Sequence, residues 1–297
     1  MMPRLSLLSI VWLVGSIALA DPVVPGFDPG PSPDTVPTIE DHALAEALRQ
    51  QVFARRDDDV PLTLGELRTI SRVESRGGNI ASLVGLEHCD DLRLIDLAGN
   101  NIDDLGPIGK LDKLQSINIS DNRVTDLAPL AGLKRLQHLE IERNQVTDLS
   151  PLAESAELRS LYAGDNSISD LTPLTGCPKL WSLDVSTNKV TSLDPLAGLS
   201  WLTTLNVADN QITDLTPLCR NDRWQLLILD GNSLSDLSPL VQHCQRDSEG
   251  ERRFAPYLRL RIGDNPIPSD RLNRQSDELR QYGVKLMGPA DAPAASD

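Results

Sequence analysis

The chain has 297 residues, of which 40% are hydrophobic but only 3% aromatic, and its formal net charge is −15. So acidic a chain argues against nucleic acid and anionic membrane surfaces as partners, because both are bound through clustered basic residues. The scarcity of aromatic residues requires a core of aliphatic side chains, which indicates a repetitive structure.

The first twenty residues have the layout of a secretory signal peptide. Arg4 gives a basic start, an apolar run begins at Leu5, and Ala18 and Ala20 are small residues at a cleavage position. An uncleaved anchor is the weaker alternative, since the run is short for a membrane span. We therefore expect cleavage after Ala20 and a secreted or periplasmic product without a further membrane span.

A Pro-rich linker and a helical cap are predicted next. Residues 21–37 contain six prolines and are expected to be disordered. The apolar spacing from Leu44 to Val52 predicts a helix over 39–56, which Thr38 can cap. The segment Thr63-Leu-Gly-Glu66 has the spacing of a capping box and predicts a second helix through Ile70. Residues 38–70 are therefore expected to close the N-terminal end of the following domain.

A 22-residue unit dominates residues 71–267. Apolar residues alternate before a recurring asparagine, which predicts a short strand with one buried face. A proline recurs in every unit after the strand, so the return side should be short 3₁₀ turns or extended chain. The asparagines, expected to form a buried ladder that satisfies backbone groups, are Asn100, Asn122, Asn144, Asn166, Asn188, Asn210 and Asn232.

The two ends of the repeat are degenerate. Gly78 replaces the asparagine at the front, and Asn265 follows Asn232 only after an insertion of 11 residues within 241–256. Counting both units predicts about nine turns. In most units an aspartate such as Asp104 precedes the return turn, and we expect it to accept a backbone N–H. Residues 268–287 are predicted to form a C-terminal cap, with a short helix around 276–279 and a strand-like 284–286, and 288–297 a disordered tail.

This unit resembles the internalin-type leucine-rich-repeat proteins of bacteria. The similarity lies in the Leu-x-x-Leu-x-Leu-x-x-Asn core and the Asp-Leu-x-Pro-Leu return. It implies an α/β fold, a curved right-handed solenoid with a parallel concave sheet, a 3₁₀ or extended convex side and a helical N-terminal cap. It says little about the partner, because members of a scaffold family bind different ligands.

Two cysteines are candidates for a disulfide. Cys219 and Cys244 fall on the same side of neighbouring turns, where the insertion begins. An exported protein meets oxidising conditions, so a bond between them would fix the insertion to the last regular repeat. The sequence leaves the pair open between bridged and free.

The concave side of the sheet is where we expect a binding site, because its side chains alternate with the buried ones and are not dictated by the repeat. We single out an acidic, titratable group and an apolar pair followed by arginines. These residues are His138, Glu140, Glu142, Tyr162, Asp184, Leu226, Ile228, Arg259 and Arg261. Leu226 and Ile228 are expected to be exposed anchors, unless the insertion or a tryptophan covers them.

No catalytic or metal site is predicted. Alternate residues of one strand lie about 6.6 Å apart, too far for His138, Glu140 and Glu142 to meet one ion. No serine or cysteine stands near a histidine in the setting of a catalytic nucleophile, and no phosphate-binding glycine loop occurs. We therefore expect a monomeric protein that binds a protein or peptide without a cofactor. A structural or glycan-binding envelope protein is the alternative, though a glycan site would need aromatic platforms.

Overall fold

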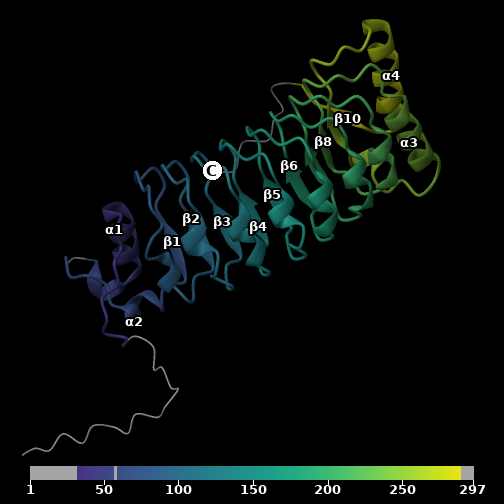
Figure 1. Cartoon of the computed structure of the whole chain (residues 1–297). Coiled ribbons are helices and arrows are strands. Elements are labelled where there is room, and N and C mark those ends of the chain that lie inside the picture. The colour runs from purple at the N-terminus through teal and green to yellow at the C-terminus, as the bar shows by residue number, and fades with distance from the viewer. Residues whose placement is uncertain (1–31, 57–58, 289–297) are drawn as a thin grey trace, which may run out of the picture. The chain divides into compact units, whose positions relative to one another are not determined.

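The computed structural model describes residues 32–56 and 59–288. Ten short strands form one parallel sheet in chain order (Figure 1). The repeat sets the register, because Leu139 pairs with Leu161 and Leu161 with Leu183, each 22 residues further on. The strands are β1 Arg72–Glu74, β2 Leu94–Asp96, β3 Ser116–Asn118, β4 His138–Glu140, β5 Ser160–Tyr162, β6 Ser182–Asp184, β7 Thr204–Asn206, β8 Leu226–Ile228, β9 Arg259–Arg261 and β10 Lys285–Leu286.

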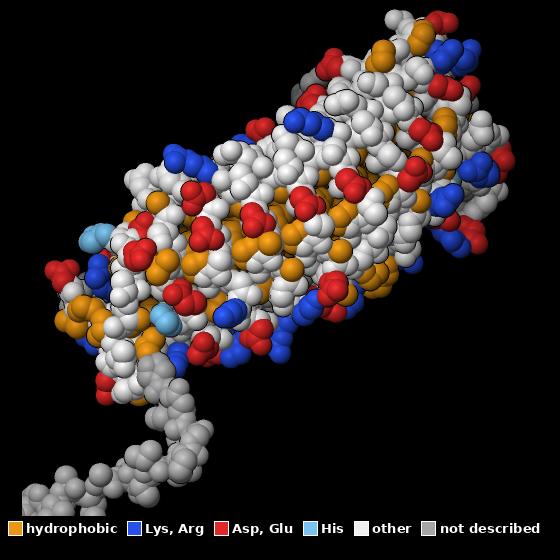
Figure 2. All heavy atoms as spheres, viewed as in Figure 1, with side chains coloured by type: hydrophobic (Ala, Val, Ile, Leu, Met, Phe, Trp, Pro, Cys, Tyr) orange, Lys and Arg blue, Asp and Glu red, His pale blue; other side chains and the backbone are white. Residues whose placement is uncertain are grey.

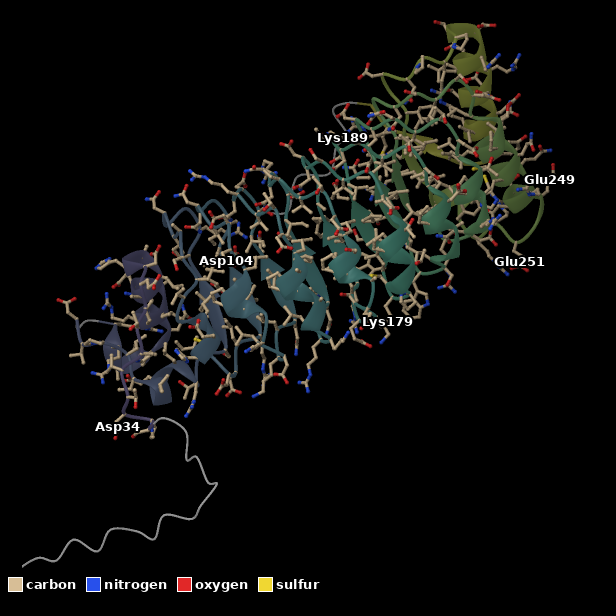
Figure 3. The ribbon with its side chains drawn as sticks, in the orientation of Figure 1. Asp34, Asp104, Lys179, Lys189, Glu249 and Glu251 are labelled. Carbon is tan, nitrogen blue, oxygen red and sulfur yellow. The ribbon has the colours of Figure 1, made fainter. Side chains whose placement is uncertain are left out.

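Short 3₁₀ helices form the return side, as the recurring prolines predict. They are η2 Leu86–His88, η3 Gly106–Ile108, η4 Ala128–Gly132, η5 Ser150–Leu152, η6 Thr172–Gly176, η7 Asp194–Gly198 and η8 Thr216–Arg220. The expected role of the aspartates is confirmed, since Asp104 Oδ1 accepts from Gly106 N at 2.7 Å. Figure 2 shows a row of acidic side chains running along this face, which begins at the Asp104 labelled in Figure 3.

Each ladder asparagine joins two turns of the solenoid. Asn122 donates from Nδ2 to the carbonyls of Leu97 and Ile119, both at 3.0 Å, and its Oδ1 accepts from Ile102 N at 2.9 Å. The same pattern recurs at the other six positions and continues at Asn265. A single carboxamide thus satisfies backbone groups that the strands leave unpaired where the chain turns inward.

The insertion does not follow the prediction of a short return turn. It folds as the α-helix α3 Ser238–Glu249, followed by η9 Ala255–Tyr257. Pro239 lies in the first turn of α3, where a missing N–H costs no helical hydrogen bond, so it does not stop the helix. Pro129 has the same place in the 3₁₀ helix η4. The added residues then let the turn continue as a helix.

The N-terminal cap differs from its prediction in detail. The first helix is shorter, α1 His42–Gln51 with η1 Phe53–Arg55 after it, and its N-cap is Asp41 rather than Thr38. Asp41 accepts from Leu44 N at 3.0 Å and also from Ala81 N at 2.8 Å, so it ties the helix to the first repeat. The capping box of Thr63 and Glu66 is confirmed, on the short helix α2 Leu64–Leu67.

Part of the expected linker is ordered against this cap. The carbonyls of Pro33 and Thr35 accept hydrogen bonds at 2.8 Å from Gly65 N and Leu64 N. These bonds use the free N–H groups of the first turn of α2, which explains why a Pro-rich segment adopts a fixed position there. The predicted signal peptide at 1–20 and most of the tail lie outside the described residues, in which no helix is long and apolar enough to cross a membrane.

Replacing Asp41 with alanine should lower the free energy of unfolding by about 1–2 kcal/mol, because one carboxylate caps α1 and binds the first repeat. The matched control is Thr38→Ala, since Thr38 is exposed and caps no helix in the structure. Urea unfolding followed by circular dichroism measures both variants. Equal losses for the two would refute the role of Asp41.

The C-terminal cap is more helical than the sequence indicates. Helix α4 spans Ser269–Gln281, begins well before the predicted 276–279 and packs against α3. Strand β10 then pairs with β9, so the sheet ends under the cap. Leu279 and Val284 are buried there, which covers the aliphatic core that an open solenoid would expose.

The candidate disulfide is not formed in the structure, in which Cys219 and Cys244 are free thiols. Cys219 Sγ instead lies 3.3 Å from the carbonyl oxygen of Pro239, to which it donates. Burial raises the pKa of Cys219 to about 11 and that of Cys244 to about 12. The thiolate is the form that attacks in disulfide formation. Both cysteines are therefore unreactive as nucleophiles at neutral pH.

Candidate functional site

A cavity of about 640 Å³ lies over strands β4 to β9 on the concave face. Its floor follows one row of the register, which runs from Glu140 through Tyr162, Asp184 and Asn206 to Ile228. The repeat places one side chain per strand into this row, so residues far apart in sequence line the same space. The lining is Glu140, Glu142, Tyr162, Ser182, Leu183, Asp184, Ser186, Thr187, Thr204, Asn206, Ala208, Asp209, Leu226, Ile228, Asp230, Arg261 and Asp264.

Most of the residues singled out in the sequence line this cavity, but two do not. His138 is half-buried outside the lining, and its Nδ1 lies 2.6 Å from Ser160 Oγ. Burial, with a smaller effect of Arg159, lowers the pKa of His138, so it is neutral at pH 7. Arg259 lines a different cavity, on the edge of the sheet.

Leu226 and Ile228 correct the expectation of exposed anchors. Their exposed fractions are only 5% and 7%, so neither projects into solvent. In register, Leu226 lies between Thr204 and Arg259, and Ile228 between Asn206 and Arg261. Polar neighbours thus flank the pair on both sides, and the pair forms an apolar floor at one end of the cavity.

Two carboxylates in the cavity have no strong partner. Glu140 accepts no hydrogen bond from the described residues, and the nearest cation to Glu142 is Arg143 Nη1 at 3.9 Å. Burial raises the pKa of both groups, and the charges of Asp96 near Glu140 and of Asp184 near Glu142 raise it further. Arg76 near Glu140 and Arg143 near Glu142 lower the pKa, but by less, so it stays raised in both. Both side chains are half-buried, so a cation that enters the cavity would relieve this repulsion.

The remaining charges of the cavity are mostly satisfied. Asp184 accepts from Asn206 Nδ2 at 2.7 Å and from Ser186 N at 2.9 Å. Arg261 Nε lies 2.8 Å from Asp230 Oδ2, and both side chains are largely buried. The arginine that was expected to flank an apolar anchor is thus neutralised inside the protein, and the cavity presents a net negative charge.

Asp209, Asp230 and Asp264 belong to the lining but were not predicted. Asp209 and Asp264 have φ angles of 53° and 54° in the turns that follow their strands. Aspartate tolerates this left-handed conformation better than most residues, so a structural role alone accounts for its presence in the sequence. The signal available for Asp209 and Asp264 was their position one residue before a ladder asparagine, whereas Asp230 lies two residues before Asn232.

Replacing Glu142 with glutamine should raise the melting temperature at pH 7 by about 1–3 °C. The pKa of Glu142 is higher in the folded protein than in the unfolded chain, so its ionised form opposes folding. The free energy of unfolding therefore falls as the pH rises from the Glu142 pKa of the unfolded chain to that of the folded protein. Near pH 3.5 Glu142 is protonated in both states, so the benefit of glutamine should vanish there. Calorimetry at the two pH values measures this, and an equal gain at both would contradict it.

The described residues contain no cluster of three or more His, Cys, Asp or Glu side chains arranged to hold a metal ion. What the arrangement offers chemically is an acidic, partly apolar recess rather than a set of reacting groups.

Comparison with known proteins identifies the repeat. A family model described as Leucine Rich repeats (2 copies) matches residues 112–154, 156–198 and 182–220. Among solved structures, internalin C2 from Listeria monocytogenes is 32% identical, covers 69% of this chain and 92% of its own, and superposes with a TM-score of 0.66. The chain belongs to the internalin family of leucine-rich-repeat proteins.

Further relatives of this internalin-type protein agree on the fold. An internalin (inlF) from Listeria monocytogenes is 29% identical, with coverage of 84% of this chain and 75% of its own and a TM-score of 0.66. A leucine-rich-repeat protein from Leptospira interrogans, at 19% identity, 76% and 62% coverage and a TM-score of 0.59, shows the fold alone. No curated protein matches. Leucine-rich-repeat proteins are typically protein-interaction modules, and the matches indicate no enzyme family.

Proposed function

We propose that this protein is an exported, monomeric binding protein whose concave cavity takes a basic segment of a protein partner. The observation that carries the proposal is the pair of half-buried carboxylates, Glu140 and Glu142, that lack a strong internal partner. Maintaining such groups costs stability, and a lysine or arginine of a ligand would offset that cost. The signal-peptide layout of residues 1–20 supports export.

The rest of the cavity supports a peptide-like ligand. Leu226 and Ile228 form an apolar floor, while Tyr162 and Asp184 offer polar atoms next to it. A basic segment with one aliphatic side chain would place its charge on the glutamates and its apolar group on that floor. The strands hold these groups on a rigid sheet, so little conformational freedom is lost on binding.

An affinity pull-down from envelope and culture-supernatant extracts tests this function. The native protein is the bait beside a Glu140→Gln, Glu142→Gln variant, which keeps shape and removes charge. Asp103→Asn is the matched control, because Asp103 is exposed and lies outside the concave cavity. Recovery of a protein by the native and control baits, with a loss of about tenfold or more for the double variant, is the expected result.

The proposal fails if the three baits recover the same proteins in equal amounts. Circular dichroism of each bait establishes that the variants are folded. Raising the salt concentration should weaken capture by the native bait, because the rim charges of such an interface are screened.

A further inference from the structure

The exposed aromatic residues of the solenoid gather on one edge. In the described residues, the large hydrophobic side chains exposed outside the N-terminal cap are Trp181, Trp201 and Tyr257, with exposed fractions of 43%, 59% and 69%. Each precedes a strand: Trp181 comes directly before β6, Trp201 before β7 and Tyr257 before β9. In a chain with only 3% aromatic residues, this concentration on one edge is unexpected.

The backbone register places these residues in continuous rows. Trp181 N donates to the carbonyl of Arg159 at 2.8 Å, and Thr203 N donates to that of Trp181 at 3.0 Å. The row continues through Gln225 to Arg259, with hydrogen bonds of 2.9 Å at each step. Trp201 lies one repeat after Lys179 and one repeat before Arg223, so a second row runs beside the first. Lys179 pairs with Glu157 at 2.5 Å, which leaves Arg223 as the cation of this row that lies beside Trp201 without an ion pair to any described residue.

We call this surface the strand-entry edge and define it by Arg159, Trp181, Trp201, Arg223, Tyr257 and Arg259. Its C-terminal half is hollowed by a cavity of about 680 Å³, lined by Thr203, Asp222, Arg223, Trp224, Gln225, Arg253, Tyr257 and Arg259. The one carboxylate of this lining, Asp222, lies 3.7 Å from Arg253, so the other arginines keep their charge. Figure 3 labels Lys179 on this edge, and Figure 2 shows Lys and Arg side chains there, interspersed with Asp and Glu. The concave cavity that contains Glu140 and Glu142 is lined by different residues.

Its arginines carry charge that the protein does not neutralise. Arg159, Arg223 and Arg259 are exposed and form no ion pair with any described residue. The chain contains 43 acidic and 28 basic residues, so acidic partners are abundant. Three unpaired guanidinium groups beside aromatic rings therefore present a local positive surface on an acidic protein, suited to a ligand that carries carboxylate or sulfate groups.

From this arrangement we propose that the strand-entry edge binds a linear acidic polysaccharide. Pyranose rings present flat C–H faces that pack on tryptophan and tyrosine rings, and the hydroxyls of the sugar can bond Thr203 and Gln225. The arginines then pair with the acidic groups of the polymer. A protein partner is disfavoured, because the edge exposes no aliphatic anchor and its rings lie open instead of filling a dry pocket.

Titration of the purified protein with polygalacturonate, followed by calorimetry and tryptophan fluorescence, tests the proposal. Dextran sulfate supplies a second acidic polymer, neutral dextran lacks the charge, and poly-glutamate carries the charge without sugar rings. Saturable binding to polygalacturonate or dextran sulfate is expected, with much weaker binding to dextran and poly-glutamate. Trp181→Ala and Trp201→Ala should each lower the affinity by about fivefold.

Arg223→Gln combined with Arg259→Gln should weaken binding and reduce its dependence on salt, while Trp201→Tyr should retain most of the affinity. Phe53→Ala is the matched control, because Phe53 is 85% exposed but belongs to the N-terminal cap. Absence of binding to both acidic polysaccharides would overturn the proposal. Equal binding of poly-glutamate, or unchanged affinity in both tryptophan variants, would overturn it as well. The Glu140→Gln, Glu142→Gln variant should bind the polysaccharide normally, which separates this surface from the concave cavity.

Discussion

Asn188→Ala should lower the free energy of unfolding by about 3–5 kcal/mol, the largest effect expected from one polar residue of the solenoid. The Asn188 side chain is 8% exposed, and its Nδ2 donates to the carbonyls of Ala163 at 3.0 Å and Val185 at 3.2 Å. Its Oδ1 accepts from Ile168 N at 2.9 Å. Alanine would leave these backbone groups buried without partners, and each such group costs about 1–3 kcal/mol.

Urea unfolding monitored by circular dichroism measures the loss. The matched control is Asn101→Ala, because the Asn101 side chain bonds the exposed Arg123 at 3.0 Å and takes no part in the ladder. That variant should stay within about 0.5 kcal/mol of the native protein. If Asn188→Ala lowers the free energy of unfolding no more than the control does, the asparagine ladder does not stabilise the fold.

Reversing the charge of Glu140 and Glu142 to lysine should lower the affinity for the captured partner by about 100-fold or more. The native cavity attracts a cation, whereas the lysines would repel it and would also form new pairs with Asp96 and Asp184. Those new pairs should leave folding intact, since both acids lie close enough to influence the glutamates they neighbour.

Surface plasmon resonance with the partner identified by pull-down measures this change. Asp103→Lys is the control on the return side and should alter the affinity little, apart from a general charge effect that 0.5 M salt removes. If the double lysine variant binds as tightly as the native protein, the carboxylates do not contact the ligand.

The sheet was predictable because the repeat fixes it locally. Leu139, Leu161 and Leu183 occupy one column in the sequence, and the same spacing makes them register partners in the structure. Each turn repeats the same small set of contacts, so the prediction depends on neighbours one repeat apart and not on distant parts of the chain. The 3₁₀ return turns were predictable for the same reason, because a proline recurs at one position of the repeat.

What escaped prediction depends on contacts that break the repeat. Helix α3 forms inside the insertion, where no other unit supplies a template. Asp41 rather than Thr38 caps α1, because Asp41 also reaches Ala81 N across 40 residues of sequence. Leu226 and Ile228 are buried although strand alternation places them on the concave face, and alternation alone does not reveal this burial.

The binding surfaces were predictable in part. The row from Glu140 to Ile228 follows from strand alternation, whereas the rim aspartates Asp209 and Asp264 lie in turns. The strand-entry edge was missed because Trp181 and Trp201 occupy positions where most units carry a polar residue, so only the structure shows that their rings remain exposed side by side with Arg159 and Arg223.

Carboxyl footprinting of the complex tests the central claim, that the concave cavity is the protein-binding site, most directly. Carbodiimide-driven labelling of Glu140 and Glu142 is compared with and without the captured partner, with Asp104 on the return side as the internal reference. The claim predicts strong protection of both glutamates and unchanged labelling of Asp104. Labelling of the two glutamates that is the same in the free and bound protein would contradict it.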